Sequence, residues 1–166
     1  MTEATGGPVA GAHGGGMLDV RQAPLAEEAA MSPEILRVVL AIVLVAHGIG
    51  HVLFLAPALR IAGWADQSGG SWLLSSTIGD GGAHAAGAIV WAAATVLFVA
   101  AGTGLLLAMD WRRPFAVVGA VVSLIGILVF WDGILTASAV PALVVDVAVI
   151  VGLLIAHWPS VDAVGA

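Results

Sequence analysis

The chain has 166 residues, of which 60% are hydrophobic and only 10% are charged, and its formal net charge is −6. A water-soluble domain carries about 25% charged residues, so this composition predicts that lipid solvates most of the surface. The five basic residues are all arginines, too few for a phosphate-binding stripe, which argues against nucleic-acid binding. The absence of cysteine excludes disulfides, thiolate metal sites and haem attached through cysteine.

Residues 1–31 are rich in glycine, alanine and acidic side chains and show no apolar period. A signal peptide would need a basic start followed directly by an apolar run, and this segment has none. We therefore expect a disordered tail, on the cytoplasmic side, ahead of the folded part.

Residues 35–56 form the apolar segment around which the chain is organised. At about 1.5 Å per residue such a helix is roughly 33 Å long, which matches a hydrocarbon core of about 30 Å. Ser32 is placed to cap this helix, Pro33 suits its first position, and Glu34 favours the positive end of its dipole. The segment predicts a first membrane-spanning helix.

Three further apolar segments predict helices over about residues 83–109, from after residue 114 to about 136, and 139–158. The longest connection, residues 65–83, is broken by glycines, and residues 71–74 suit a short turn lying on the membrane. The predicted fold class is all-α, a transmembrane four-helix bundle over residues 32–159. Residues 160–166 would form a short C-terminal tail.

Four spans place both termini on the same side of the membrane. That side would hold Arg21, Arg37, Arg112 and Arg113, whereas the opposite side would hold Arg60 alone. The excess of basic residues predicts cytoplasmic termini in an integral protein of a prokaryotic cytoplasmic membrane.

Ionisable residues from several spans are expected in the outer half of the bundle. Counted from the outer helix ends, His51 and Asp146 both lie about 9–10 Å deep and His47 about 15 Å. Asp132 lies about 6 Å deep, and His84 is near the rim. A charged side chain near the bilayer centre costs about 2.5–3.5 kcal/mol, so each should face protein or water and have a partner. We expect His51 to pair with Asp146, with Asp132 and His84 above them.

His47 and His51 are four residues apart and share a helix face. We interpret the cluster first as hydrogen-bonded pairs that fix helix register, and next as a proton or ligand site. A tight metal site is less favoured, because a zinc-type centre would need Asp146 and Asp132 as further ligands. Bis-histidine haem is less favoured than a quinone or a metal, because the histidines lie at unmatched depths.

Two stripes of residues suit either packing or binding. Trp91 and Thr95, beside the polar cluster, would line a pocket for an aromatic or quinone-like ligand, or would belong to a packed helix face. Ala148, Gly152 and Ala156 form a small-residue run that permits close helix approach, either within the bundle or with a second protomer or larger membrane complex.

Residues 37–54, RVVLAIVLVAHGIGHVLF, resemble the first helix of DoxX-like small membrane proteins, with an arginine, an apolar run and His-Gly near mid-helix. His51 stands where such chains often have lysine. The resemblance implies a four-helix bundle and an association with redox or complex assembly, since some relatives are accessory subunits of quinone-linked oxidation of sulfur compounds.

Two functional hypotheses follow from these patterns. The first is an accessory or ligand-binding subunit of a membrane complex, quinone- or redox-linked, with the His/Asp cluster ordering the bundle or binding a small ligand. The alternative is a membrane redox enzyme or a proton-coupled carrier that uses a buried His51–Asp146 pair.

Overall fold

The computed structural model describes residues 31–63, 67–134 and 136–165, and every regular element in these ranges is helical. The predicted tail over residues 1–31 lies outside them, apart from Met31. Four helical segments of the described chain are long and apolar enough to cross a membrane: Pro33–Ala58, Ser75–Leu106, Arg112–Val129 and Thr136–Ile155. The chain is therefore an all-α protein with the composition and helix lengths of an integral membrane protein.

The first span consists of two helices, α2 (Pro33–Gly50) and α3 (Val52–Ala58). The amide of Ile35 donates a hydrogen bond to the Ser32 hydroxyl at 3.3 Å, which confirms the predicted cap. The two helices are separated only at His51, so they follow one another as a single apolar span.

The second span is α4 (Ser75–Leu106). It begins eight residues before residue 83, the start that the sequence predicted. Gly69, with φ 69°, and Gly70 lie ahead of the helix, whereas within α4 it is Gly79 that departs from helical geometry, with φ 73° and ψ 163°. Helices tolerate isolated glycines at a cost of about 1 kcal/mol each, so the glycine-rich stretch becomes a kinked first turn rather than a loop. The turn predicted ahead of it, over residues 71–74, is present.

The last two spans are also shifted from their predicted limits. Helix α5 (Arg112–Val129) ends at Val129 rather than near residue 136, because the chain then forms a 3-10 turn, η1 (Trp131–Gly133). Helix α6 (Thr136–Ile150) begins three residues earlier than residue 139 and passes into a π-helical turn, η2 (Val151–Ile155).

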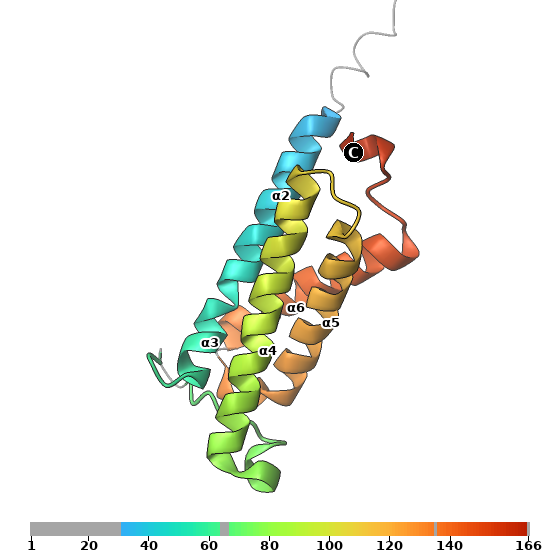
Figure 1. Cartoon of the computed structure of the whole chain (residues 1–166). Helices are drawn as coiled ribbons and strands as arrows, with labels where there is room; N and C mark the ends of the chain where they lie inside the picture. Colours follow the sequence, from blue (N-terminus) through green and yellow to red (C-terminus); the bar gives the residue numbers. More distant parts are fainter. Residues whose placement is uncertain (1–30, 64–66, 135, 166) are drawn as a thin grey trace, which may run out of the picture. The chain divides into compact units, whose positions relative to one another are not determined.

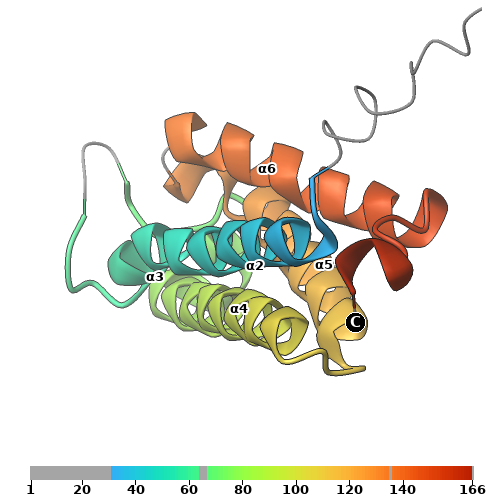
Figure 2. The same cartoon turned by 90° about the horizontal axis from the view of Figure 1, so that it is seen from above.

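The closely packed pairs of long helices are α2–α4, α4–α5 and α5–α6, an arrangement visible from two directions (Figures 1 and 2). Glycines allow the closest approaches. A Cβ atom at Gly48 of α2 would lie 2.9 Å from Cβ of Phe98, and one at Gly102 of α4 would lie 2.8 Å from the carbonyl oxygen of Ala41. Small residues of this kind are what membrane helices use to pack closely.

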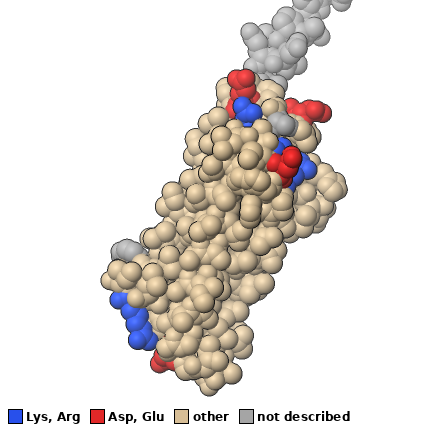
Figure 3. Space-filling model, in the orientation of Figure 1, with Lys and Arg blue, Asp and Glu red and all other residues tan. Residues whose placement is uncertain are grey.

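On the face drawn in Figure 3, the charged residues lie at the two ends of the bundle, and the surface between them is uncharged. This uncharged region is the surface expected to contact lipid acyl chains. Large apolar side chains of the described spans are correspondingly exposed, among them Ile42, Ile89 and Val96.

The C-terminal residues, predicted as a short tail, fold back onto the bundle. The turn η3 (Asp162–Val164) packs against α2, where Val164 is buried. A guanidinium nitrogen of Arg37 donates a hydrogen bond of 3.2 Å to the carbonyl of Gly165. The start of α2 and the described C-terminal end therefore lie at the same end of the bundle (Figure 1).

Candidate functional site

Four polar side chains form one hydrogen-bonded network in the bundle. They are His47 of α2, His51 at the α2–α3 junction, Ser123 of α5 and Asp146 of α6. His47 Nε2 lies 2.9 Å from Asp146 Oδ1, and the Ser123 hydroxyl lies 2.6 Å from Asp146 Oδ2. On its other side, the same hydroxyl lies 2.6 Å from His51 Nε2. Asp146 thus contacts one histidine directly and the other through Ser123.

The network is enclosed by protein. Ser123 and Asp146 have no exposed surface and His51 is 1% exposed, whereas 9% of the His47 side chain is accessible. Buried polar groups are tolerated in an apolar interior only when they are hydrogen-bonded, and every one of these side chains has a partner within the network. His47 is the member nearest to the outside.

His51 owes its orientation to the junction between α2 and α3. Its ring nitrogen Nδ1 lies 2.9 Å from the carbonyl oxygen of His47, one helical turn earlier. Its backbone amide instead donates to the carbonyl of Gly48 at 3.2 Å. The imidazole therefore bonds to the His47 carbonyl, which in a regular helix would accept the backbone N–H of His51. This substitution explains why the regular helix is interrupted at His51.

Aromatic rings of α4 pack against both imidazoles. The His51 ring stacks with Phe98 at a centroid distance of 5.7 Å and an interplanar angle of 15°, and with Trp91 at 6.0 Å and 28°. The edge contact between His47 and Phe98 has a centroid distance of 4.5 Å. These rings leave the polar edges of the imidazoles as the directions in which hydrogen bonds form.

The donors and acceptors of the network can be counted. A carbonyl oxygen only accepts, so the contact with the His47 carbonyl requires a proton on Nδ1 of His51. If His51 is neutral, its Nε2 accepts the single hydroxyl proton of Ser123, and Asp146 must then be protonated to donate to Ser123. If His51 is an imidazolium, Ser123 accepts from Nε2 and donates to an ionised Asp146. Both arrangements satisfy every contact.

These two arrangements contain the same number of protons. They interconvert when the Ser123 hydroxyl passes one proton on while it receives another, so that the proton moves between His51 and Asp146 without a change in heavy-atom positions. Without this proton, His51 would be neutral and Asp146 ionised. One of the two 2.6 Å contacts of Ser123 would then have no hydrogen between its lone pairs.

Two residues expected near the cluster lie elsewhere. Asp132 accepts a hydrogen bond of 2.8 Å from the backbone amide of Trp72, in the turn before α4. His84 lies with its Nδ1 3.2 Å from the carbonyl of Ala58, at the end of α3. Both side chains stabilise connections at the end of the bundle where α3 ends and α4 begins, and neither joins the network.

Trp91 and Thr95, the predicted pocket residues, are part of the packed interior. Trp91 is 1% exposed and contacts His51, while the Thr95 hydroxyl donates to the carbonyl of Trp91 at 2.8 Å. The described residues enclose an apolar cavity of about 270 Å³ in another place, at the end of the bundle that holds Arg112 and Arg113, and neither Trp91 nor Thr95 lines it.

Ser123 is the network residue that sequence reasoning missed. In the sequence it stands four residues after Gly119, a spacing of small residues that is typical of a packing face. A hydroxyl in the middle of an apolar span is a weak signal, because serine in a membrane helix can satisfy itself on the preceding turn of backbone. Its role depends on lying between a histidine and an acid from other helices.

His47, His51 and Asp146 offer ligand atoms that all lie within 4.8 Å of one another, so they are the group in the described chain that could hold a metal ion. The Nδ1 contact of His51 would orient its Nε2 toward a metal, as in many zinc sites. However, the two Nε2 atoms are engaged by Asp146 and Ser123, so an ion would have to replace both hydrogen bonds.

Comparison of the chain with protein-family models, with curated proteins and with solved structures found no match. The function proposed below therefore depends on the geometry and chemistry of the chain itself.

Proposed function

We propose that this protein is an accessory, proton-binding subunit of a quinone- or redox-linked membrane complex, in a prokaryotic cytoplasmic membrane, with cytoplasmic termini. The observation that carries the proposal is the chain of contacts His51–Ser123–Asp146, with 2.6 Å on each side of the hydroxyl. A hydroxyl between a base and an acid is an arrangement through which a proton passes in either direction.

The charge of the network supports a proton-binding role. With its proton bound, the network is neutral overall, either as three uncharged groups or as one imidazolium beside one carboxylate. Loss of the proton leaves a net negative charge among apolar helices, which a low-dielectric interior disfavours. A neutral, proton-bound network therefore suits this apolar surrounding, and His47 is the member of the network whose side chain is partly accessible.

The accessory role is supported by the extent of the described chain. The described residues form four candidate membrane spans and the connections between them. The polar side chains of the network hydrogen-bond to one another. A proton acceptor with this architecture suits a subunit that receives protons from, or supplies them to, a quinone or substrate bound by a partner. The resemblance of residues 37–54 to DoxX-like chains points to the same class of complex.

Nitrogen NMR of histidine-labelled protein in nanodiscs tests the proton site directly. We expect His51 to be observed as the Nδ1–H tautomer or as the imidazolium. The exposed His157 serves as the internal control for a histidine outside the network. A neutral His51 beside an ionised Asp146, whichever ring nitrogen carries the proton, would contradict the proposal.

The Ser123→Ala and Ser123→Thr pair tests the hydroxyl. The infrared carboxyl band of Asp146 should depend on the state of His51 in the wild type and in Ser123→Thr. In Ser123→Ala we expect this band to become independent of His51. Equal coupling in the alanine variant would show that the hydroxyl carries no proton.

The accessory role has its own test. Affinity purification from native membranes in mild detergent should recover a redox subunit together with this chain. The visible absorption spectrum of the isolated chain should show no band from a bound cofactor. Turnover of a quinone or sulfur substrate by the isolated chain would instead favour the enzyme.

A proton-coupled carrier is the second candidate, because the two arrangements of the network differ only in the position of the proton. Proteoliposome flux driven by a pH gradient distinguishes it. Flux that is lost in Asp146→Asn would replace the accessory role with transport.

A further inference from the structure

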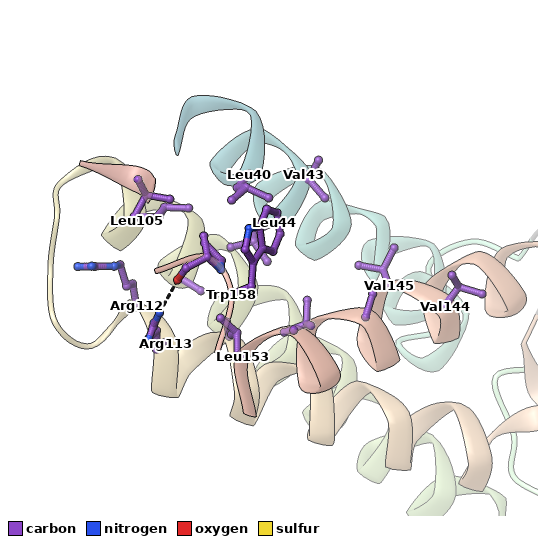
Figure 4. Close-up of a pocket in the computed structure, with 17 residues that line it drawn as sticks. Leu40, Val43, Leu44, Leu105, Arg112, Arg113, Val144, Val145, Leu153 and Trp158 are labelled. Atoms are coloured by element: carbon purple, nitrogen blue, oxygen red, sulfur yellow. Dashed lines mark hydrogen bonds between the residues drawn. The ribbon is translucent and has the colours of Figure 1, made fainter. Parts of the chain in front are cut away.

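The apolar cavity of about 270 Å³ lies between α2 and α6, at the end of the bundle where α5 begins (Figure 4). Leu40 and Leu44 of α2 form one wall, and Val145 and Val149 of α6 form another. The volume is near the lower limit of small-molecule sites, which occupy about 300–1,000 Å³. The cavity is a second site, distinct from the hydrogen-bonded network.

This cavity opens to the lipid. Val43 and Val144, which belong to its lining, are 46% and 60% exposed, and they lie on the two helices between which it is formed. These helices are not among the closely packed pairs of the described chain, so a lateral opening separates them. A chain-like apolar group can therefore enter from the side, as lipid does between membrane helices.

Two arginines give the cavity one charged end. Arg112 and Arg113 are part of its lining, and they lie at the opposite end from Val144 in the close-up of the site (Figure 4). No acidic residue lines the cavity, and neither guanidinium forms an ion pair among the described residues. Each does have a backbone acceptor, Met109 for Arg112 and Pro159 for Arg113, which fixes its position and leaves other N–H donors.

Trp158 also lines the charged end, and it is 50% exposed. Tryptophan is favoured at the boundary between acyl chains and headgroups, where its ring is partly apolar and its N–H can bond to polar groups. The cavity therefore has the polarity of half a bilayer: an apolar length, an indole at the boundary and two positive charges beyond it.

We propose that this cavity binds an anionic phospholipid, with one acyl chain between α2 and α6 and its phosphate on Arg112 and Arg113. Basic pockets between membrane helices bind acidic headgroups, and arginine matches phosphate oxygens in a two-pronged geometry. The N-terminus of α5, where both arginines lie, adds a favourable dipole for an anion. The lipid fills the lateral opening that the helices leave.

Native mass spectrometry of the full chain, released from nanodiscs containing equal parts of phosphatidylglycerol and phosphatidylcholine, tests the proposal. We expect one phosphatidylglycerol retained per chain, in preference to phosphatidylcholine. The Arg112→Gln/Arg113→Gln variant should reduce this preference by roughly fivefold for each arginine removed. Arg60→Gln, which removes a charge at the opposite end, is the matched control and should retain the lipid.

A second variant tests the apolar part without changing charge. Ala148→Phe places a ring in the cavity lining and should reduce retention of both lipids, with α-helical content and thermal stability checked by circular dichroism. If the chain retains inorganic phosphate in place of a lipid, or if it retains the two lipids equally, the proposal is wrong. A dimer that is lost in Ala148→Phe would show that a second copy is the occupant instead.

The outcome is independent of the proton-binding proposal. The lipid variants alter no residue of the His47–His51–Ser123–Asp146 network, so the NMR signals of His51 should be unchanged in each of them.

Discussion

The carboxyl group of Asp146 on α6 lies 2.9 Å from Nε2 of His47 on α2, and this hydrogen bond joins two helices that are not among the closely packed pairs. It lies between the aromatic interior on one side and the lipid-facing cavity on the other. Val43 and Leu44, which line the cavity, are one turn before His47, and Val145 and Val149 flank Asp146. The hydrogen bond between His47 and Asp146 therefore holds α2 and α6 together where close apolar packing between them is lacking.

Removal of the Asp146 side chain should destabilise the protein. In Asp146→Ala, the buried His47 and Ser123 groups lose a partner, and we expect a loss of about 1–3 kcal/mol in the free energy of unfolding. Asp146→Asn keeps an oxygen acceptor for His47 and gains N–H donors for Ser123, so its loss should be below about 1 kcal/mol. Unfolding in mixed micelles measures both. Val96→Ala, at a 65% exposed position of α4, is the control for a lipid-facing change. An Asp146→Ala variant as stable as the wild type would contradict the structural role of the network.

Gly48→Ala and Gly50→Ala form a matched pair for the contact between α2 and α4. A Cβ atom at Gly48 would lie 2.9 Å from Phe98 Cβ and 3.1 Å from the Thr95 carbonyl oxygen, whereas one at Gly50 would meet no atom within 4 Å. The first substitution should therefore cost about 1–3 kcal/mol through overpacking. The second should be neutral or stabilise by up to about 1 kcal/mol. The same unfolding experiment separates them, and equal effects would mean that α2 and α4 are not in close contact at Gly48.

Metal binding is expected to be weak. Zinc would have to displace the bonds from His47 to Asp146 and from His51 to Ser123, and it would also have to remove the network proton. Elemental analysis of protein purified without chelator should find less than one ion per chain. Stoichiometric zinc that disappears in His51→Ala would show instead that the cluster is a metal centre.

Single-cysteine labelling tests the orientation in the membrane, and the absence of native cysteine makes each label specific. Ser76 near the start of α4 and Ser160 after η2 are exposed residues at opposite ends of the bundle. In intact cells, a membrane-impermeant maleimide should label Ser76→Cys, whereas Ser160→Cys should react only after lysis. The reverse pattern would place Arg112 and Arg113 outside, in conflict with the excess of arginine at that end.

The number and order of the spans were predictable because a membrane helix is recognised by its apolar composition. The depth of Asp146 was less so, since it depended on where α6 begins. With the observed start at Thr136, Asp146 lies about 15 Å into the helix instead of about 9–10 Å. A shift of three residues is nearly one turn, which is why Asp146 meets His47 directly and reaches His51 through Ser123.

By itself, the sequence determined that the chain has four apolar helices and that histidine and aspartate share a region of the interior. Only the tertiary structure decided which imidazole meets the acid, that Ser123 lies between His51 and Asp146, and that a cavity separates α2 from α6. The physical reason is that helix rise translates residue number into position along the axis. The rotation of each helix and the choice of its neighbours are set by packing, such as the contact of Gly48 with Phe98, which connects residues distant in the chain.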